Sequence, residues 1–116
     1  MKKYLVTLSR AVYYKDILYS LEMKSVGEFN SIEDALYDAR KDLICIAGNA
    51  AADIYDPTFE PQECAKYVDD YLSNASFREN ISDDDFNHNP ITIIEHSYAI
   101  DECVQEKNTY TIYKIS

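Results

Sequence analysis

The sequence predicts an α+β fold in which a four-stranded antiparallel sheet is covered on one face by two helices, in the order ββααββ. Apolar and polar side chains alternate with a period of two near both ends of the chain, which indicates strands. A 3.6-residue apolar period occupies the middle, which indicates helices. With 116 residues, 47% of them apolar, the chain is expected to form a single domain over residues 1–116.

The first two strands are predicted to form an antiparallel hairpin. Residues 3–13 and 17–26 both alternate, and residues 15–16 stand at the expected turn between them. We expect one face of this hairpin to be buried, as in sheets that carry helices on one side. Arg10 falls on the otherwise apolar face of the first strand, so we expect that end of the face to be frayed or solvated.

Two helices are predicted to follow the hairpin. The hydroxyl of Ser31 is placed to accept a backbone N–H at the start of the first helix. An apolar stripe then continues to about Asp56, and Pro57 is expected to end the helix. The second helix is expected to begin at Pro61, a residue that the first helical turn tolerates well, and to fade near Asn74.

The remaining chain is predicted to return to the sheet. Residues 78–90 are polar and acidic and are expected to form a long loop. Residues 91–98 and 109–115 are rich in β-branched and aromatic side chains and are predicted to be strands, joined by residues 101–108.

Charge is distributed unevenly along the chain. Residues 1–50 carry seven acidic and seven basic side chains, whereas residues 51–106 carry fourteen acidic side chains against two basic ones. The negative field of this second half attracts cationic partners, at the cost of repulsion among its own carboxylates. Solubility alone does not require a neutral first half, although a net charge of −10 is also compatible with a surface that is merely solvated.

One acidic segment resembles the front of a calcium loop. Asp83, Asp85 and Asn87 place oxygen atoms at alternate positions, as a hard cation requires. However, His88 stands where such a loop needs glycine, and Ile94 stands where it needs a bidentate glutamate. A solvated acidic loop is therefore expected, and a cation-dependent switch remains an alternative.

The sequence does not predict an enzyme, a metal site or a cofactor. Zinc ligands lack the usual spacing, and two glycines exclude a glycine-rich phosphate loop. The three cysteines, Cys45, Cys64 and Cys103, are expected to be reduced thiols in or near the core. Cys103 and His96 are placed to lie near each other, but this pairing is expected by chance in such a chain.

Direct binding to nucleic acid and insertion into a membrane are not expected either. The few basic side chains of the first hairpin are largely balanced by acids, and nucleic-acid binding needs a basic patch. No stretch of the chain approaches the ~20 apolar residues of a membrane span. The apolar run at residues 4–8 is too short for a signal peptide. We therefore expect a soluble, cytosolic protein.

The acidic half is predicted to be a partner-binding surface. Carboxylates three or four positions apart on a helix lie about 5–6 Å from each other, close to the ~7 Å phosphate spacing along one DNA strand. Aromatic residues interleave with these acids, and aromatic anchors ringed by charge are typical of binding surfaces. The predicted contact residues are Asp69, Asp70, Glu79, Asp83, Asp84, Asp85, Tyr67, Tyr71 and Phe86.

In size, charge and lack of catalytic motifs the chain resembles the acidic, nucleic-acid-mimicking inhibitors carried by phages and plasmids, the anti-CRISPR and anti-restriction proteins. The resemblance covers composition along the whole chain and rests on no motif, so it assigns no site residues. It implies a non-enzymatic inhibitor in the cytoplasm of a bacterial host cell. The inhibitor would occupy the basic groove of a nuclease or another nucleic-acid-binding protein, such as a CRISPR effector or a restriction enzyme.

A small protein-interaction or regulatory module without nucleic-acid mimicry remains the main alternative. Such a module would bind an ordinary protein or form a homodimer, and the small residues at 47–52 would supply the contact. Salt would then have little effect on binding. The sequence leaves the oligomeric state open.

Overall fold

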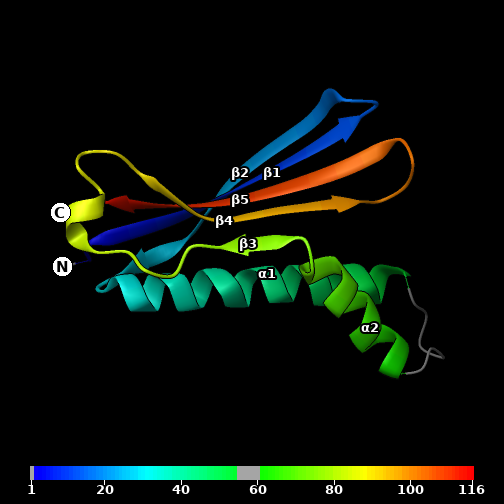
Figure 1. The fold of residues 1–116 in the computed structure, drawn as a ribbon, viewed down its shortest axis with the longest axis horizontal. Helices are drawn as coiled ribbons and strands as arrows, with labels where there is room; N and C mark the ends of the chain where they lie inside the picture. Colours follow the sequence, from blue (N-terminus) through cyan, green and yellow to red (C-terminus); the bar gives the residue numbers. More distant parts are fainter. Residues whose placement is uncertain (1, 55–60) are drawn as a thin grey trace.

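The computed structural model describes residues 2–54 and 61–116, with residues 50–54 and 61–64 described through their backbone alone. Strands and helices follow one another as in Figure 1. The elements are β1 (Tyr4–Tyr14), β2 (Ile17–Phe29), α1 (Ile32–Ile54), α2 (Pro61–Leu72), β3 (Ala75–Phe77), the 3-10 helix η1 (Asp83–Asp85), β4 (Ile91–Ala99) and β5 (Val104–Lys114).

The fold is α+β, as predicted, but the expected four-stranded sheet and the order ββααββ are wrong. The sheet has five antiparallel strands in the spatial order β2-β1-β5-β4-β3. The additional strand β3 follows α2 and pairs with β4, with Ala75 opposite His96. Three residues are too few to show an alternating pattern, so the sequence gives no sign of this strand.

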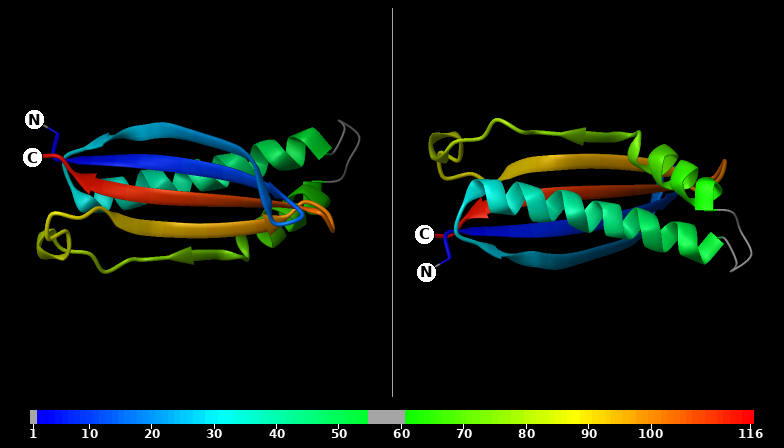
Figure 2. Two further views of the ribbon diagram at one scale, coloured as in Figure 1. Left: turned by 90° about the horizontal axis from the view of Figure 1, so that it is seen from above. Right: turned by 90° about the horizontal axis from the view of Figure 1, so that it is seen from below.

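Both helices lie on the same face of the sheet, and the opposite face carries none of the described helices (Figures 1 and 2). The core lies between these two layers. Small residues of α1, including Ala35 and Ala39, let the helix approach the sheet closely, and the buried Leu43 continues the same face. Above them, Leu8 of β1 and Ile112 of β5 are completely buried.

Local signals in the sequence explain how the first half of the chain begins and turns. Ser31 Oγ accepts the backbone N–H of Asp34 at 3.1 Å, which confirms the predicted start of α1. Lys15 and Asp16 have φ values of 50° and 66°, so both adopt the left-handed conformation that tight hairpin turns require. The predicted turn between the first two strands is therefore confirmed.

The expectation that the second strand has a buried face is wrong for most of its length. The strand β2 is exposed from Ile17 to Ser25 and becomes buried only at Phe29. It forms one edge of the sheet, so a single neighbouring strand, β1, lies beside it. Figure 1 shows the hairpin of β1 and β2 projecting away from α1 toward its tip, which the alternating pattern cannot reveal, so α1 buries only the end of β2 near Phe29.

Two other expectations are corrected in the second half. The last strand begins at Val104, five residues before the expected Thr109, because the predicted connection is largely part of the hairpin between β4 and β5. The register between these strands shifts at Ile93, which buries both Ile93 and Ile94. The predicted stop of the first helix at Pro57 lies outside the described residues.

Candidate functional site

Six of the predicted contact residues lie along one side of the molecule, which we call the acidic edge. The acidic edge consists of Asp69, Asp70, Glu79, Asp83, Asp84 and Asp85, all of them exposed. Figure 2 shows α2, β3 and η1 following one another along the side of the sheet opposite β2. The acidic edge therefore runs along the long axis of the molecule, which measures 47 Å.

One end of the acidic edge is fixed to the two termini by Asp83. The Tyr4 hydroxyl donates a hydrogen bond to Asp83, and Lys114 Nζ lies 3.6 Å from the second carboxylate oxygen. The bond from Tyr4 holds the pKa of Asp83 below its ordinary value, helped by the charge of Lys114. The same bond, together with burial, raises the pKa of Tyr4 to about 12. Asp83 is thus a fixed anionic group.

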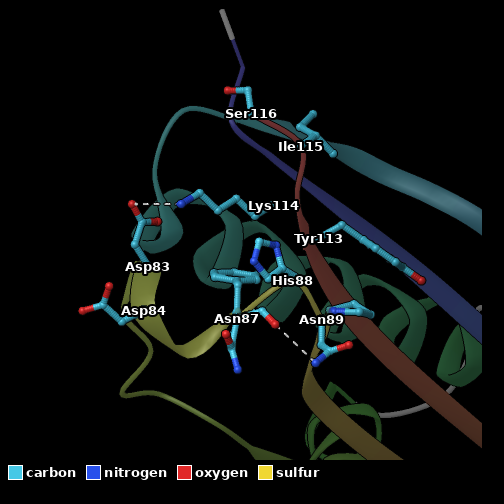
Figure 3. A pocket seen from close by; sticks show the side chains of 11 residues that line it. Asp83, Asp84, Asn87, His88, Asn89, Tyr113, Lys114, Ile115 and Ser116 are labelled. Carbon is cyan, nitrogen blue, oxygen red and sulfur yellow. Dashed lines mark hydrogen bonds and ion pairs between the residues drawn. The ribbon is translucent and has the colours of Figure 1, made fainter.

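The neighbouring carboxylates of η1 have different surroundings. Asp85 accepts the backbone N–H of Ser82 at 2.8 Å and so caps the short helix. In Figure 3, a dashed line joins Asp83 to Lys114, whereas no such line reaches the side chain of Asp84. Within the described residues, Asp84 forms no hydrogen bond and no ion pair. Of the three, Asp84 is therefore the carboxylate with its charge free for a partner.

The middle of the acidic edge is partly neutralised. Arg40 of α1 forms an ion pair with Glu79, and its guanidinium carbon lies 4.7 Å from the centre of the Phe77 ring. This arrangement ties the segment after β3 to α1. It also leaves Glu79 with less charge to offer than its exposure alone suggests.

The other end of the acidic edge lies on α2. Asp69 and Asp70 are exposed in the last turn of this helix, and within the described residues their carboxylates have no hydrogen bond or ion pair. A helix C-terminus favours cations over anions, so these two charges contribute nothing to the stability of α2. Their position suits binding a cationic partner better than it suits folding.

The predicted aromatic anchors are not part of this surface. Tyr71 is 1% exposed and Phe86 is 3% exposed, so both belong to the core. Tyr67 is half-buried and packs with its ring centre 6.3 Å from that of Tyr71 and 6.0 Å from that of Tyr98. Aromatic residues that recur with the helical period between acids lie on the inner face of α2, which explains why they are buried.

Beneath α2 lies a buried polar network that the sequence analysis missed. Arg10 Nη2 donates to Glu106 Oε1 at 2.5 Å, and Arg10 Nε donates to Asn108 Oδ1 at 3.2 Å. The Tyr71 hydroxyl donates to the same Glu106 oxygen at 3.3 Å, and the Asn108 amide donates to His96 Nδ1 at 3.1 Å. Glu106, Asn108 and His96 are all buried. Arg10 is therefore not frayed, because it pairs with the buried Glu106.

The sequence does carry a signal for this network. Residues of β5 that are two positions apart share a face, so Glu106 and Asn108 lie on the same side as the buried Tyr110 and Ile112. Polar residues on a buried face need hydrogen-bond partners. Arg10, on the apolar face of β1, is such a partner for Glu106 and Asn108. Among the described residues, every buried side-chain nitrogen or oxygen has a hydrogen-bond partner.

The two ring nitrogens of His96 are both engaged in this network. Because Nδ1 accepts from Asn108, the proton lies on Nε2, which donates to the backbone carbonyl of Tyr71 at 2.6 Å. His96 thus ties β4 to the end of α2.

Cys103, the neighbour of His96 considered in the sequence analysis, is half-buried. Cys45 is exposed, so the expectation that Cys45 lies in or near the core is wrong.

The remaining sequence hypotheses concern cations and small residues. Asp83 and Asp85 turn to different partners inside the chain, and the described residues contain no group of His, Cys, Asp or Glu side chains arranged to hold a metal ion. A hollow of about 690 Å³ between η1 and the end of β5 is lined by both acidic and basic side chains (Figure 3). In the small-residue patch, Ala47 is buried in the core.

None of the helices in the described part of the chain combines the length and the apolar composition needed to cross a bilayer. Comparisons with protein-family models, with curated proteins and with solved structures found no match to this chain.

Proposed function

We propose that the protein is a non-enzymatic acidic binding protein that inhibits a nucleic-acid-binding protein or nuclease by occupying its basic groove, in the manner of anti-CRISPR and anti-restriction proteins. The observation that carries the proposal is the acidic edge. Six exposed carboxylates extend from α2 to η1 along the long axis of the molecule. A row of anionic groups on a rigid support is what a groove built for phosphates would accept.

The unpaired members of the acidic edge contribute most of the attraction. Asp69, Asp70 and Asp84 lack ion pairs within the described residues, whereas Glu79 and Asp83 each face a cation of the same chain. Long-range attraction between such carboxylates and a basic groove raises the association rate and weakens with salt. The segments that carry these carboxylates are anchored in the core by the buried side chains of Tyr71 and Phe86.

Asp69 and Asp70 offer the cleanest test of the proposal. The wild-type protein and the double variant Asp69→Lys/Asp70→Lys are immobilised and exposed to lysates of bacteria that carry restriction enzymes or CRISPR effectors. We expect the wild type to capture a basic nucleic-acid-binding protein that duplex DNA or ~0.5 M salt releases, because both weaken charge-driven contacts. The double variant should fold normally, since lysine at a helix C-terminus is favourable.

The matched control is Glu22→Lys/Glu28→Lys, which changes the net charge equally on an exposed strand of the neutral half. The proposal requires capture to fall at least tenfold in the α2 variant and to persist in this control. Equal loss in both variants would mean that net charge alone matters. Capture of an acidic protein or of a metabolic enzyme would refute the proposal.

A second candidate function is a protein-interaction module that pairs with itself. The exposed edge strand β2 favours this candidate, because an edge strand can pair with a strand of a second copy. This strand lies on the side of the sheet opposite the acidic edge. The two functions are compatible, since they use opposite sides of the sheet.

A further inference from the structure

Among the described residues, no strand pairs with the outer edge of β2, which is long and carries large apolar side chains. Leu21 is 55% exposed and Met23 is 64% exposed, and Ile17 and Tyr19 are more exposed still. The outer backbone groups of an edge strand are free to pair with another strand, and proteins normally keep such edges short or charged. This thirteen-residue edge is neither short nor strongly charged.

The central part of β2 is regular enough to accept a further strand. Pairing with β1 is interrupted at Tyr19 and at Val26, where one residue of β2 is left without an opposite residue. Between these two bulges, residues 20–25 keep an uninterrupted register. A partner strand would therefore pair with this window.

The two faces of this window differ in chemistry. Lys24 stands opposite the buried Leu8, and its Nζ lies 3.9 Å from Asp42 of α1, so Lys24 points to the helix side of the sheet. Glu22, two residues away, shares that face, whereas Leu21 and Met23 point to the open face. Any strand added here meets two opposite charges on one face and two apolar side chains on the other.

The order of Glu22 and Lys24 along β2 favours pairing with the same strand of a second copy. When β2 pairs antiparallel with β2 of a second copy, a two-fold axis passes through one residue of the window. An axis at Glu22 or at Lys24 places like charges opposite each other, which disfavours pairing. An axis at Met23 places Glu22 of each copy opposite Lys24 of the other, which forms two opposite-charge pairs. The same register places the two Met23 side chains together on the open face.

We propose that the protein forms a homodimer in which the β2 strands of two copies pair antiparallel around Met23, joining two five-stranded sheets into one. The neutral half of the chain supplies the contact, so the copies meet where net charge does not repel them. The acidic edges then lie at the two outer borders of the joined sheet, because β3 and β2 are opposite edges.

Charge reversal and charge exchange test this register. The variants are Glu22→Lys, Lys24→Glu and the exchange Glu22→Lys/Lys24→Glu. Their mass in solution is measured by sedimentation velocity over protein concentrations up to about 1 mM. Glu28→Lys is the control, because it makes the same change of charge on β2 beyond the bulge at Val26. Circular dichroism and urea unfolding at low concentration verify that each variant folds.

We expect the wild type and the Glu28→Lys control to show twice the 13.4 kDa mass of one chain. Each single reversal should raise the dissociation constant of the dimer about tenfold or more, because it creates two like-charge pairs. The exchange should restore dimerisation. A single-chain mass for the wild type at every concentration would overturn the proposal. So would reversals that leave the dimer unchanged, or an exchange that fails to restore it.

Discussion

The two edges of the sheet are built for different kinds of contact. The β2 edge is long, carries only three charged residues and exposes aliphatic side chains. The opposite side is formed by the three-residue strand β3 between two helical segments, and it exposes the six carboxylates of the acidic edge. Backbone pairing suits the first edge, whereas long-range attraction of cations suits the second.

This difference gives the uneven charge of the chain a structural meaning. Residues 1–50 build the β2 edge and most of α1, and residues 61–85 build the acidic edge. Six of the fourteen acidic side chains of residues 51–106 therefore lie on the side of the sheet opposite β2. The buried network joins β1, which pairs with β2, to β4, β5 and α2, so hydrogen bonds connect the two edges through the core.

The largest expected effect comes from breaking the support beneath the acidic edge. Tyr71→Ala should lower the free energy of unfolding by about 3–5 kcal/mol, because it removes a buried ring and leaves a cavity. Tyr71→Phe should cost only about 1 kcal/mol, since it keeps the ring and loses hydrogen bonds to Glu106 and Asn108. Urea unfolding measures both. A stable Tyr71→Ala variant would show that Tyr71 is not a core residue.

A smaller effect is expected from cutting the link between β1 and β5. Arg10→Met should lower the free energy of unfolding by about 2 kcal/mol, because Glu106 stays buried and loses its cationic partner. The double variant Arg10→Met/Glu106→Gln should be more stable than the single one, since no buried charge remains. If the two variants unfold at the same urea concentration, Glu106 does not depend on Arg10.

A pH-dependent effect is expected at η1, where the acidic edge meets the termini. The pKa of Asp83 is lowered in the folded protein, so its contribution to stability is complete above the unfolded pKa and is lost as the pH falls through the folded value. The difference in unfolding free energy between wild type and Asp83→Asn should therefore shrink below pH 3.8. Asp84→Asn is the control on the same turn. A constant difference for Asp83→Asn across this range would contradict the assignment.

The smallest expected effect tests whether the dimer contact lies on the β2 edge or on the small residues of α1. A methyl group added at Gly48 meets no atom of the described residues within 4 Å beyond the adjoining backbone of its own helix, so Gly48→Ala should raise the free energy of unfolding by about 0.5–1 kcal/mol. The oligomeric mass should stay unchanged. A loss of dimer in this variant would assign the contact to α1 instead of β2.

Local signals predicted a large part of this fold. The cap at Ser31, the apolar period of α1 and the turn at Lys15 and Asp16 each depend on a few neighbouring residues, and each is found in the structure. The strand β3 and the exposure of β2 were not predictable in this way. Three residues carry no period, and a strand's place in the sheet depends on contacts far away in sequence.

The predicted carboxylates and the predicted aromatic anchors differ in their exposure. All six predicted carboxylates are exposed, because charged side chains avoid burial when no partner is available. Tyr71 and Phe86 are buried, since apolar rings near carboxylates fill the core whenever the period of the helix or the path of the loop turns them inward. Charge therefore predicts a surface better than an aromatic residue predicts an anchor.

The central claim is that the acidic edge and the β2 edge serve separate contacts. The most direct test compares the amount of DNA-releasable basic protein captured by Asp69→Lys/Asp70→Lys with the amount captured by Glu22→Lys/Glu28→Lys. Both variants change the net charge equally. The account predicts that capture falls at least tenfold for the first variant and persists for the second. Equal capture by the two variants would contradict it.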